Sequence, residues 1–328
     1  MNKNTLRKLI SAGLLLALIV VFTLSSDYFL TLNNFMEIFR DASVVGIMGI
    51  GVTMVILTAG IDLSTGSMMA LVGMTMANIY RYTLWPIWLM ILAGIAVGAL
   101  AGLFNGMIIT RLNLPEFIAT LSTMSMYRAL TYIISIKQNG LITSQALKAQ
   151  SFIKLGKSVG GVYYVIIAFV VLALIGQIIL KYTRYGTNLY AVGSNIKAAR
   201  LSGINTDRTR CLAYVITGFC TGIAAVFMTA RLQSTTALLG DGMEFNVIAA
   251  VVVGGCSLAG GRGDIIGTLI GAVFMAALDN GIYKFQINTA YQLIIKGIII
   301  ICVVVFDSWY NSFMDEASRN KKLKGVRK

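Results

Sequence analysis

The sequence predicts an all-α protein that crosses a membrane several times. Of its 328 residues, 57% are hydrophobic and 12% are charged, with a mean hydropathy of +0.80. A soluble protein carries about 25% charged residues. The apolar residues form long runs, such as 85–109 and 162–180. A helix needs about 20 apolar residues to cross a hydrocarbon core about 30 Å thick. Several of these runs are therefore long enough to span the membrane.

We expect about ten transmembrane segments in one polytopic helix bundle, a single transmembrane domain over residues 1–328. The first apolar run is long for a signal peptide and lacks an A-x-A-like cleavage site, so we interpret it as a retained span. An alternative of eight spans treats 43–59 and 244–259 as re-entrant pieces. The ten candidates are 9–26, 43–59, 65–83, 86–109, 116–136, 162–181, 211–230, 244–259, 264–283 and 290–308.

The basic residues predict which side of the membrane each loop faces. The net charge is +14, and the positive residues gather at the N-terminus, in the loop 181–210 and in the tail 309–328. Lysine and arginine accumulate on the cytoplasmic side of membrane proteins. We therefore expect a multi-pass membrane protein, surrounded by lipid, with both termini and this loop in the cytoplasm. The charge then needs no nucleic-acid partner. The lysines of 137–161, on the predicted outer side, depart from this rule.

The chain shows no catalytic constellation and no energy source. It contains no histidine, and its four cysteines lie in or beside apolar segments without paired spacing, so we expect no metal site and no disulfide framework. The segment GKS at 156–158 lacks the first glycine of a phosphate-binding loop. We expect no enzyme activity and no cofactor on this chain. It is either a self-sufficient carrier or a subunit that another chain drives.

The segment TAGIDLSTGS, residues 58–67, places an aspartate, two glycines and four hydroxyl side chains between two apolar runs. It is either a cytoplasmic turn with Asp62 exposed or a helix break inside the membrane. In the second case Asp62 caps a helix that begins near Leu63, and the hydroxyls of Ser64, Thr65 and Ser67 bind nearby backbone groups.

Two matches between the halves of the chain indicate an internal duplication. GCSLAGG at 255–261 aligns with GIDLSTG at 60–66, and NGIYKFQIN at 280–288 aligns with NGMIITRLN at 105–113. Duplicated halves with broken helices are typical of transporters. Interhelical hydrogen bonding is the alternative for each polar residue. The candidate residues of a translocation pathway for an uncharged, hydroxyl-rich solute are Asp62, Ser64, Thr65, Asn105, Asn113, Ser257, Asn280 and Asn288.

Other residues in the spans predict helix packing. Charged side chains at membrane depth usually pair or face the bundle interior, so Asp279 and Lys296 are a candidate ion pair, and Arg128 and Glu116 are further such charges. Glycines recur every fourth residue in two spans, which permits close approach of helices. These glycines are Gly94, Gly98, Gly102 and Gly106 in one span and Gly263, Gly267 and Gly271 in the other.

The loop 181–210 contains a short predicted helix. Ser194 or Asn195 can cap a helix that starts near Ile196, and Gly203 can end it. A helix of about two turns is marginal in water and needs support from the fold or from a partner. The alternative is a solvated connector.

Three segments together resemble the ribose-type permease family of bacterial ABC importers. They are TLNNFMEIFRDASVVGIMGIGVTMVILTAGIDLSTGS, GTNLYAVGSNIKAARLSGINTDRTR and GMEFNVIAAVVVGGCSLAGGRGDIIGTLIGA, and the likeness extends over about 33–307. The resemblance implies a second permease chain, identical or paralogous, a cytoplasmic ATP-binding cassette subunit that binds ATP and Mg²⁺, and an extracytoplasmic sugar-binding protein. It also implies that the loop 181–210 couples the permease to the ATPase, and we call it the coupling loop. The residues that would meet the ATPase are Gly193, Asn195, Ala198, Ala199, Arg200, Leu201, Ser202 and Gly203.

The resemblance therefore predicts a permease subunit that imports a monosaccharide, ribose or a related sugar, by alternating access. Cys256 and Ala259 stand where relatives often have small hydroxyl residues, so the resemblance does not identify the sugar. The competing hypothesis is a facilitator or an ion-coupled sugar carrier that works without partner chains.

Overall fold

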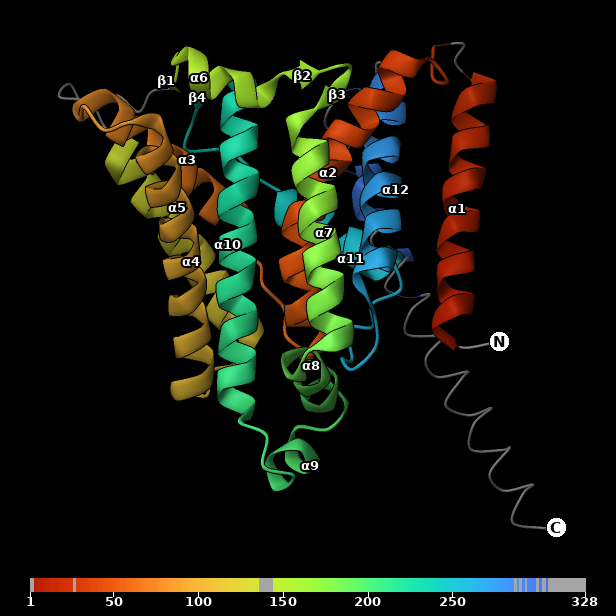
Figure 1. The fold of residues 1–328 in the computed structure, drawn as a ribbon. Helices are drawn as coiled ribbons and strands as arrows, with labels where there is room; N and C mark the ends of the chain where they lie inside the picture. The colour runs from red at the N-terminus through yellow and green to blue at the C-terminus, as the bar shows by residue number, and fades with distance from the viewer. Residues whose placement is uncertain are drawn as a thin grey trace. The chain divides into compact units, whose positions relative to one another are not determined.

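A computed structural model gives the protein an all-α fold with four strands of two residues each (Figure 1). The structure describes residues 3–25, 28–135, 144–285, 288, 291–292, 294–298, 301–302 and 305, without the side chains of 3–10. The chain divides into Met1–Gly281 and Ile282–Lys328, and each part is described by itself.

Five helices make up the first half of the chain. The predicted spans for this half are confirmed as helices, each to within a few residues except at the starts of α1 and α2, which begin 6 and 11 residues earlier than predicted. Thr31 caps α2 by accepting the backbone N–H of Asn34, and Pro86 fixes the start of α4. The helices are α1 Lys3–Ser25, α2 Leu32–Leu57, α3 Thr65–Tyr82, α4 Ile87–Arg111 and α5 Glu116–Ser135.

The middle of the chain forms small elements at both ends of the long helices. Figure 1 shows α6, β2 and β3 at one end and α8 and α9 at the other. The antiparallel pair β1–β4 joins Gln145 to Thr235, and β2 pairs with β3. The elements are β1 Gln145–Ala146, α6 Gln150–Ile153, η1 Lys154–Gly156, β2 Ser158–Val159, β3 Val162–Tyr163, α7 Tyr164–Tyr182, α8 Arg184–Ser194 and α9 Ile196–Leu201.

The remaining elements of the first part are α10 Thr206–Leu232, β4 Ser234–Thr235, α11 Met243–Val253 and α12 Ile265–Lys284, whose last three residues belong to the second part. Among the described residues, α2, α4, α7, α10 and α12 are long and apolar enough to cross a membrane. The predicted span 244–259 is wrong in length, because α11 ends at Val253. Its 11 residues rise about 16 Å, half of a hydrocarbon core.

The central helix of the bundle is α2. Nearly its whole C-terminal two-thirds is buried, whereas α4 and α7 keep one exposed apolar face. A helix enclosed by protein can be apolar all round, and a helix at the rim needs an apolar face toward lipid. The shorter re-entrant piece proposed at 43–59 is therefore wrong, since this segment belongs to a helix of 26 residues.

The glycine spacing produces close helix packing, as predicted. On α4, Gly98 lies against Gly218 and Gly222 of α10, and Gly102 lies against the backbone of Tyr214. A Cβ atom at Gly102 would overlap the carbonyl oxygen of Tyr214. On α12, Gly267 lies against the backbone of Gly254, the residue after α11, and Gly271 lies against the backbone of Ala250 and Gly254. These contacts fix α4 to α10 and α12 to α11 with backbone-to-backbone proximity.

In the second part, residues 291–292, 294–298, 301–302 and 305 are helical and lie within the predicted span 290–308. The basic tail, 309–328, lies outside the described residues.

Candidate functional site

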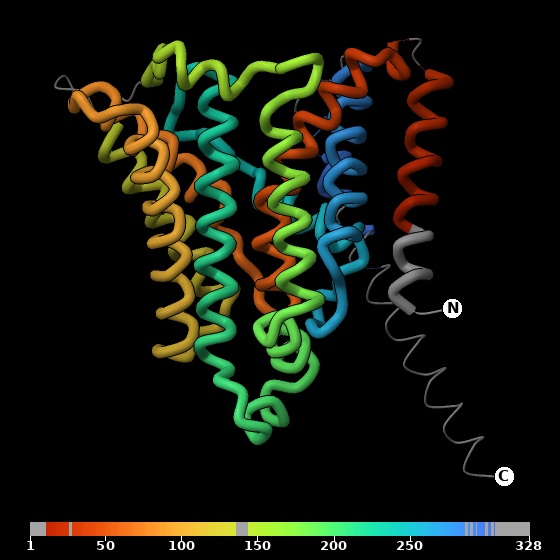
Figure 2. Tube along the Cα trace, in the orientation of Figure 1, coloured from red at the N-terminus to blue at the C-terminus, as the bar shows by residue number. Residues whose placement is uncertain are grey.

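The segment TAGIDLSTGS is a helix break buried in the protein. The helix α2 ends at Leu57, Ala59 takes a left-handed conformation with φ 62°, and α3 begins only at Thr65. Figure 2 shows the chain running back from the end of α2 as an extended segment before α3 starts. Asp62 is 1% exposed, and Ser64 and Thr65 are fully buried. The alternative of an ordinary turn with Asp62 exposed is therefore wrong.

A chain of hydrogen bonds holds this break in place. The Oδ1 atom of Asp62 accepts the backbone N–H of Ser64 at 2.9 Å and its hydroxyl at 2.7 Å. Asn105 on α4 donates to the Ser64 hydroxyl at 2.8 Å, and the Tyr127 hydroxyl on α5 lies 3.0 Å from Asn105 Oδ1. Buried polar groups in an apolar bundle need such partners. The network ties the break to two long helices.

Two details of the predicted cap are wrong. The helix starts at Thr65, two residues later than expected, so Asp62 binds the N–H of Ser64 ahead of the helix and none of the N–H groups in its first turn. The hydroxyl oxygens of Thr65 and Ser67 are buried, and no described residue bonds to them. The backbone of the break is instead held by Thr120 and Tyr214, whose hydroxyls donate to the Ile61 carbonyl at 3.3 and 3.4 Å.

A second break, which the sequence analysis missed, lies at residues 233–242 between α10 and α11. Its backbone turns through left-handed residues at Gln233, Gly240 and Gly242. Arg128 on α5 is 14% exposed at its side chain, donates to the carbonyls of Ala237 and Leu239, and pairs with Asp241 at 3.3 Å. Arg128 therefore faces the bundle interior, as predicted for a charge at membrane depth. A signal was present: TTALLGDGM combines hydroxyls, glycines and an acid, as TAGIDLSTGS does.

The first turns of α3 and α11 meet in the interior. Gly66 lies against the carbonyl of Gly240 and the carboxyl of Glu244, and a Cβ atom at Gly66 would overlap both. Glu244 is 1% exposed, and no described residue bonds to its Oε2 atom. The sequence analysis placed Glu244 at the start of a full span and so missed it. The two breaks thus meet at a buried polar contact between Gly66, Gly240 and Glu244, although other residues of the second break are exposed.

The loop 254–264 contains the segment 255–261, whose sequence aligns with that of the first break. This loop lies beside the beginning of the first break. The N–H of Gly261 donates to the carbonyl of Leu57 at 2.9 Å, and Gly260 lies against Ala59. Ser257 is buried in this loop, where its N–H donates to the Arg262 carbonyl at 3.0 Å. This loop connects α11 to α12.

The basic loop folds into two helices, as predicted for its second half. The helix α9 starts at Ile196, Asn195 caps it by accepting the N–H of Ala198 at 3.0 Å, and Gly203 leaves it with φ 81°. Leu201 is 90% exposed and lies at the end of the bundle marked by α9 in Figure 1.

One part of the predicted surface of this helix is wrong. Ala199 is 4% exposed, so it faces the fold. Arg200 pairs with Asp207 at 3.1 Å and with Thr206, which secures α9 to the start of α10. The outward surface therefore consists of Ile196, Lys197, Ala198, Arg200 and Leu201, with the capping residues Asn195, Ser202 and Gly203 also exposed.

The helix α8, in the first half of the basic loop, is joined to the loop 254–264 by a hydrogen bond. The Tyr190 hydroxyl donates to the carbonyl of Gly263 at 2.8 Å. Burial raises the pKa of Tyr190 to about 12, and the neighbouring Asp264 and Cys256 act in the same direction. The hydroxyl therefore stays protonated and able to donate across the ordinary pH range.

The other predicted pathway residues lie elsewhere. Asn113 is exposed after α4, and Asn288 is exposed in the second part of the chain. Asn280 on α12 donates to Asn34 on α2 at 3.0 Å, an interhelical hydrogen bond. Asp279 accepts from Asn246 at 3.4 Å, and its pairing with Lys296 stays a prediction because the two residues belong to different parts of the chain. The structure thus brings together Asp62, Ser64, Thr65 and Asn105.

Long apolar helices, glycine contacts and buried helix breaks define a polytopic α-helical membrane protein. Residues 34–304 match the family described as branched-chain amino acid transport system / permease component. The chain belongs to this permease family.

Several relatives carry the names of sugar permeases. The chain is 37% identical to the ribose import permease protein RbsC of Escherichia coli (strain K12) over 300 residues, which is 90% of this chain and 92% of that protein. It is 36% identical to the D-allose transport system permease protein AlsC of the same strain, over 89% of each chain. It is 31% identical to that strain's xylose transport system permease protein XylH, over 90% of each. The resemblance found in the sequence is confirmed.

Proposed function

We propose that this chain is the permease subunit of a binding-protein-dependent ABC importer that moves a monosaccharide into the cytoplasm. The observation that carries the proposal is the pair α8 and α9, a folded basic element whose exposed tip has an apolar residue, Leu201. An element of this kind fits contact with a partner chain. The names of the relatives, for ribose, allose and xylose, support a sugar as the solute.

The same proposal supplies the partners. A cytoplasmic ATP-binding cassette subunit with ATP and Mg²⁺ drives transport, an extracytoplasmic sugar-binding protein delivers the solute, and a second permease chain completes the membrane core. The chain crosses the inner membrane about ten times, with α11 completing one crossing together with the segment 233–242 that precedes it, and both termini are cytoplasmic. The segment 60–66, which leads from α2 into α3, and its match 255–261 between α11 and α12 each link two helices, which supports an internal duplication with these two segments as its equivalent points.

Transport proceeds by alternating access. ATP binding draws the two ATPase copies together, and their movement pushes the coupling loop of each permease chain and tilts the bundles. The polar groups near the first break are mainly amides, hydroxyls and carbonyls, such as Asn105 and Tyr127. Movement of these groups into a pathway offers an uncharged sugar both donors and acceptors.

The test is reconstitution of the purified chain into liposomes, alone and with its ATPase and sugar-binding protein. We expect uptake of labelled ribose, allose or xylose only when all components and ATP are present. Because a separate protein captures the solute, the chain alone gives no more flux than empty liposomes. Flux through the chain alone, without ATP, would instead establish the self-sufficient carrier.

A further inference from the structure

Three backbone segments that are distant in the sequence meet at the cytoplasmic end predicted for the bundle. They are the end of α2 with Ala59, the end of α8 at Gly193 and Ser194, and Gly260 with Gly261 in the loop 254–264. We call this three-way contact the backbone junction.

The junction leaves no space between its backbones. A Cβ atom at Gly193 would overlap the carbonyl oxygen of Leu57 and lie 2.6 Å from the nitrogen of Gly261. A Cβ atom at Gly260 would lie 2.8 Å from the Cβ of Ala59 and 2.9 Å from the carbonyl oxygen of Gly193. Real Cβ atoms do not approach other atoms so closely, and peptide backbone cannot turn aside as a flexible side chain can. Each segment therefore contacts the other two directly.

Hydrogen bonds close the junction. The last carbonyls of a helix lack partners within it, and that of Leu57 is satisfied by the N–H of Gly261 at 2.9 Å. On the other side, Tyr190 of α8 donates to Gly263 of the same loop at 2.8 Å. Gly260, Gly261 and Gly263 all have positive φ, which glycine adopts without strain. The loop is thus held between α8 and α2.

The backbone junction adjoins the first helix break and is connected to the second break through α11. Ala59 lies at the start of the first helix break, six residues before α3 begins at Thr65. The loop 254–264 follows α11, whose first turn lies beside Gly66 and directly follows the second break at 233–242. We propose that the backbone junction transmits movement of α8 and α9 to both helix breaks at once. Gly193 and Tyr190 are the positioning residues, because they hold α8 against the end of α2 and the loop 254–264. This inference rests on the proposed function, because it assumes that an ATPase moves α9.

The experiment uses the reconstituted complex and measures two quantities: the rate of ATP hydrolysis and the number of sugar molecules imported per ATP hydrolysed. The resemblance grouped Gly193 with the residues that meet the ATPase, but Gly193 belongs to α8 and its Cβ position points at Leu57 and Gly261, into the fold. Gly193→Ala therefore forces the junction apart and leaves the exposed surface of α9 unchanged. We expect ATP hydrolysis within about twofold of the unaltered complex and at least a tenfold fall in sugar imported per ATP.

Tyr190→Phe is the milder variant. It removes the hydrogen bond to Gly263 and keeps the ring that packs in the fold. We expect sugar imported per ATP to fall roughly two- to tenfold, the range that one hydrogen bond contributes. The matched controls are Gly13→Ala, where nothing lies within 4 Å of an added Cβ, and Tyr182→Phe, an exposed tyrosine. Both should match the unaltered complex.

Normal import per ATP in Gly193→Ala, at a normal level in the membrane, overturns the proposal. If Gly193→Ala does not insert into the membrane, Tyr190→Phe becomes the deciding variant. An unchanged number of sugar molecules imported per ATP in Tyr190→Phe then overturns the proposal. A failure of the proposed function looks different, because then even the unaltered chain stimulates no ATPase and imports sugar without it.

Discussion

Single residues in the first break combine burial with polarity. Asp62 sits in the interior of an apolar bundle, where its Oδ1 atom accepts two hydrogen bonds from Ser64 and no described residue bonds to its Oδ2 atom. Leaving a buried donor unpaired costs about 1–3 kcal/mol. The stability of the break therefore depends on the oxygen that accepts, and much less on the second oxygen.

Two substitutions at Asp62 separate these roles. Asp62→Leu leaves the N–H and the hydroxyl of Ser64 without their acceptor, and we expect it to reduce the free energy of unfolding by about 2–4 kcal/mol. Asp62→Asn keeps one accepting oxygen for Ser64 but buries an amide NH2 group where the Oδ2 atom has no described partner, so we expect a smaller loss, about 1–2 kcal/mol. Thermal unfolding in detergent measures both variants. Equal destabilisation by the two would mean that the carboxyl group itself, through its charge or its proton, holds the break.

At the scale of elements, the helix α9, which we propose contacts the ATPase, has an inner and an outer face. Ala199 is buried against the fold, whereas Arg200 is exposed and pairs at the surface with Asp207. Substitutions at these two positions would disturb the loop itself. Leu201 is almost fully exposed, and an apolar side chain in that position gains free energy only by meeting a partner.

We therefore expect Leu201→Glu to lower sugar uptake at least tenfold in cells while leaving the amount of inserted chain unchanged. The acidic side chain places an uncompensated charge where a partner surface would bury the leucine. The matched control is Leu84→Glu, a fully exposed leucine between α3 and α4 at the opposite end of the bundle from α9. Its uptake should be normal. Normal uptake by Leu201→Glu as well would show that the tip of α9 does not contact the ATPase.

The helix breaks were predicted unequally. Hydroxyls, glycines and an acid between apolar runs indicated the break at 58–64, and its burial confirmed it. The break at 233–242 has the same residue types, but the strong apolar run after it gave the appearance of a full span. Hydropathy measures the length of an apolar run and cannot tell where a helix starts within it. Contacts such as those of Arg128 with Ala237 and Leu239 decided the second break.

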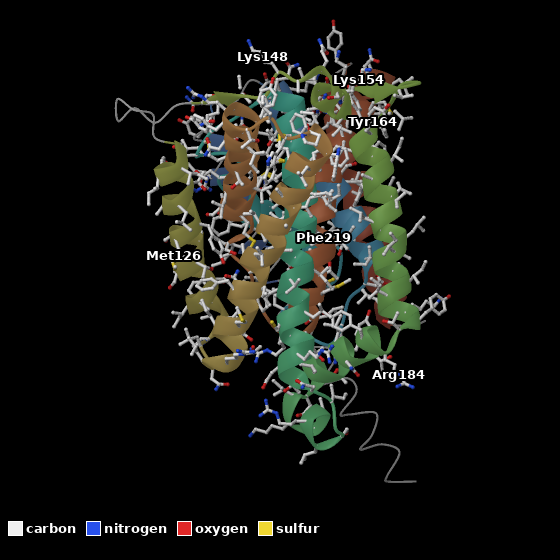
Figure 3. The ribbon with its side chains drawn as sticks, turned by 60° about the vertical axis from the view of Figure 1, so that its left-hand side comes forward. Met126, Lys148, Lys154, Tyr164, Arg184 and Phe219 are labelled. Carbon is white, nitrogen blue, oxygen red and sulfur yellow. The ribbon has the colours of Figure 1, made fainter. Side chains whose placement is uncertain are left out.

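For the whole molecule, the charges on the loops predict an orientation that the bundle makes testable. Figure 3 shows Lys148 and Lys154 toward one end of the bundle and Arg184 toward the other. The loop of Arg184 is richer in basic residues and shares the predicted cytoplasmic side with both termini. The lysine-bearing segment 144–163 must then face outward, against the usual charge bias.

The orientation can be measured with single cysteines placed at Lys154 and Leu201, in a chain whose four native cysteines are replaced. Both positions are exposed, so a thiol reagent can reach them. We expect a membrane-impermeant reagent to label Lys154→Cys in intact cells and Leu201→Cys only after the membrane is opened. Labelling of Leu201→Cys from outside would contradict the cytoplasmic coupling loop and, with it, the proposed contact with an ATPase.

The sequence by itself determined the class of the protein, nearly all helix positions and the capped helix at 196–201, because hydrophobic length, glycine spacing and capping residues act over a few neighbouring positions. It did not determine which polar residues share a site. Ser64 meets Asn105, Asn105 meets Tyr127, and Gly193 meets Leu57 and Gly261. Leu57 and Gly193 are 136 positions apart in the sequence. Only the tertiary packing of the helices brings such residues together, because no local pattern records which faces of two helices will touch.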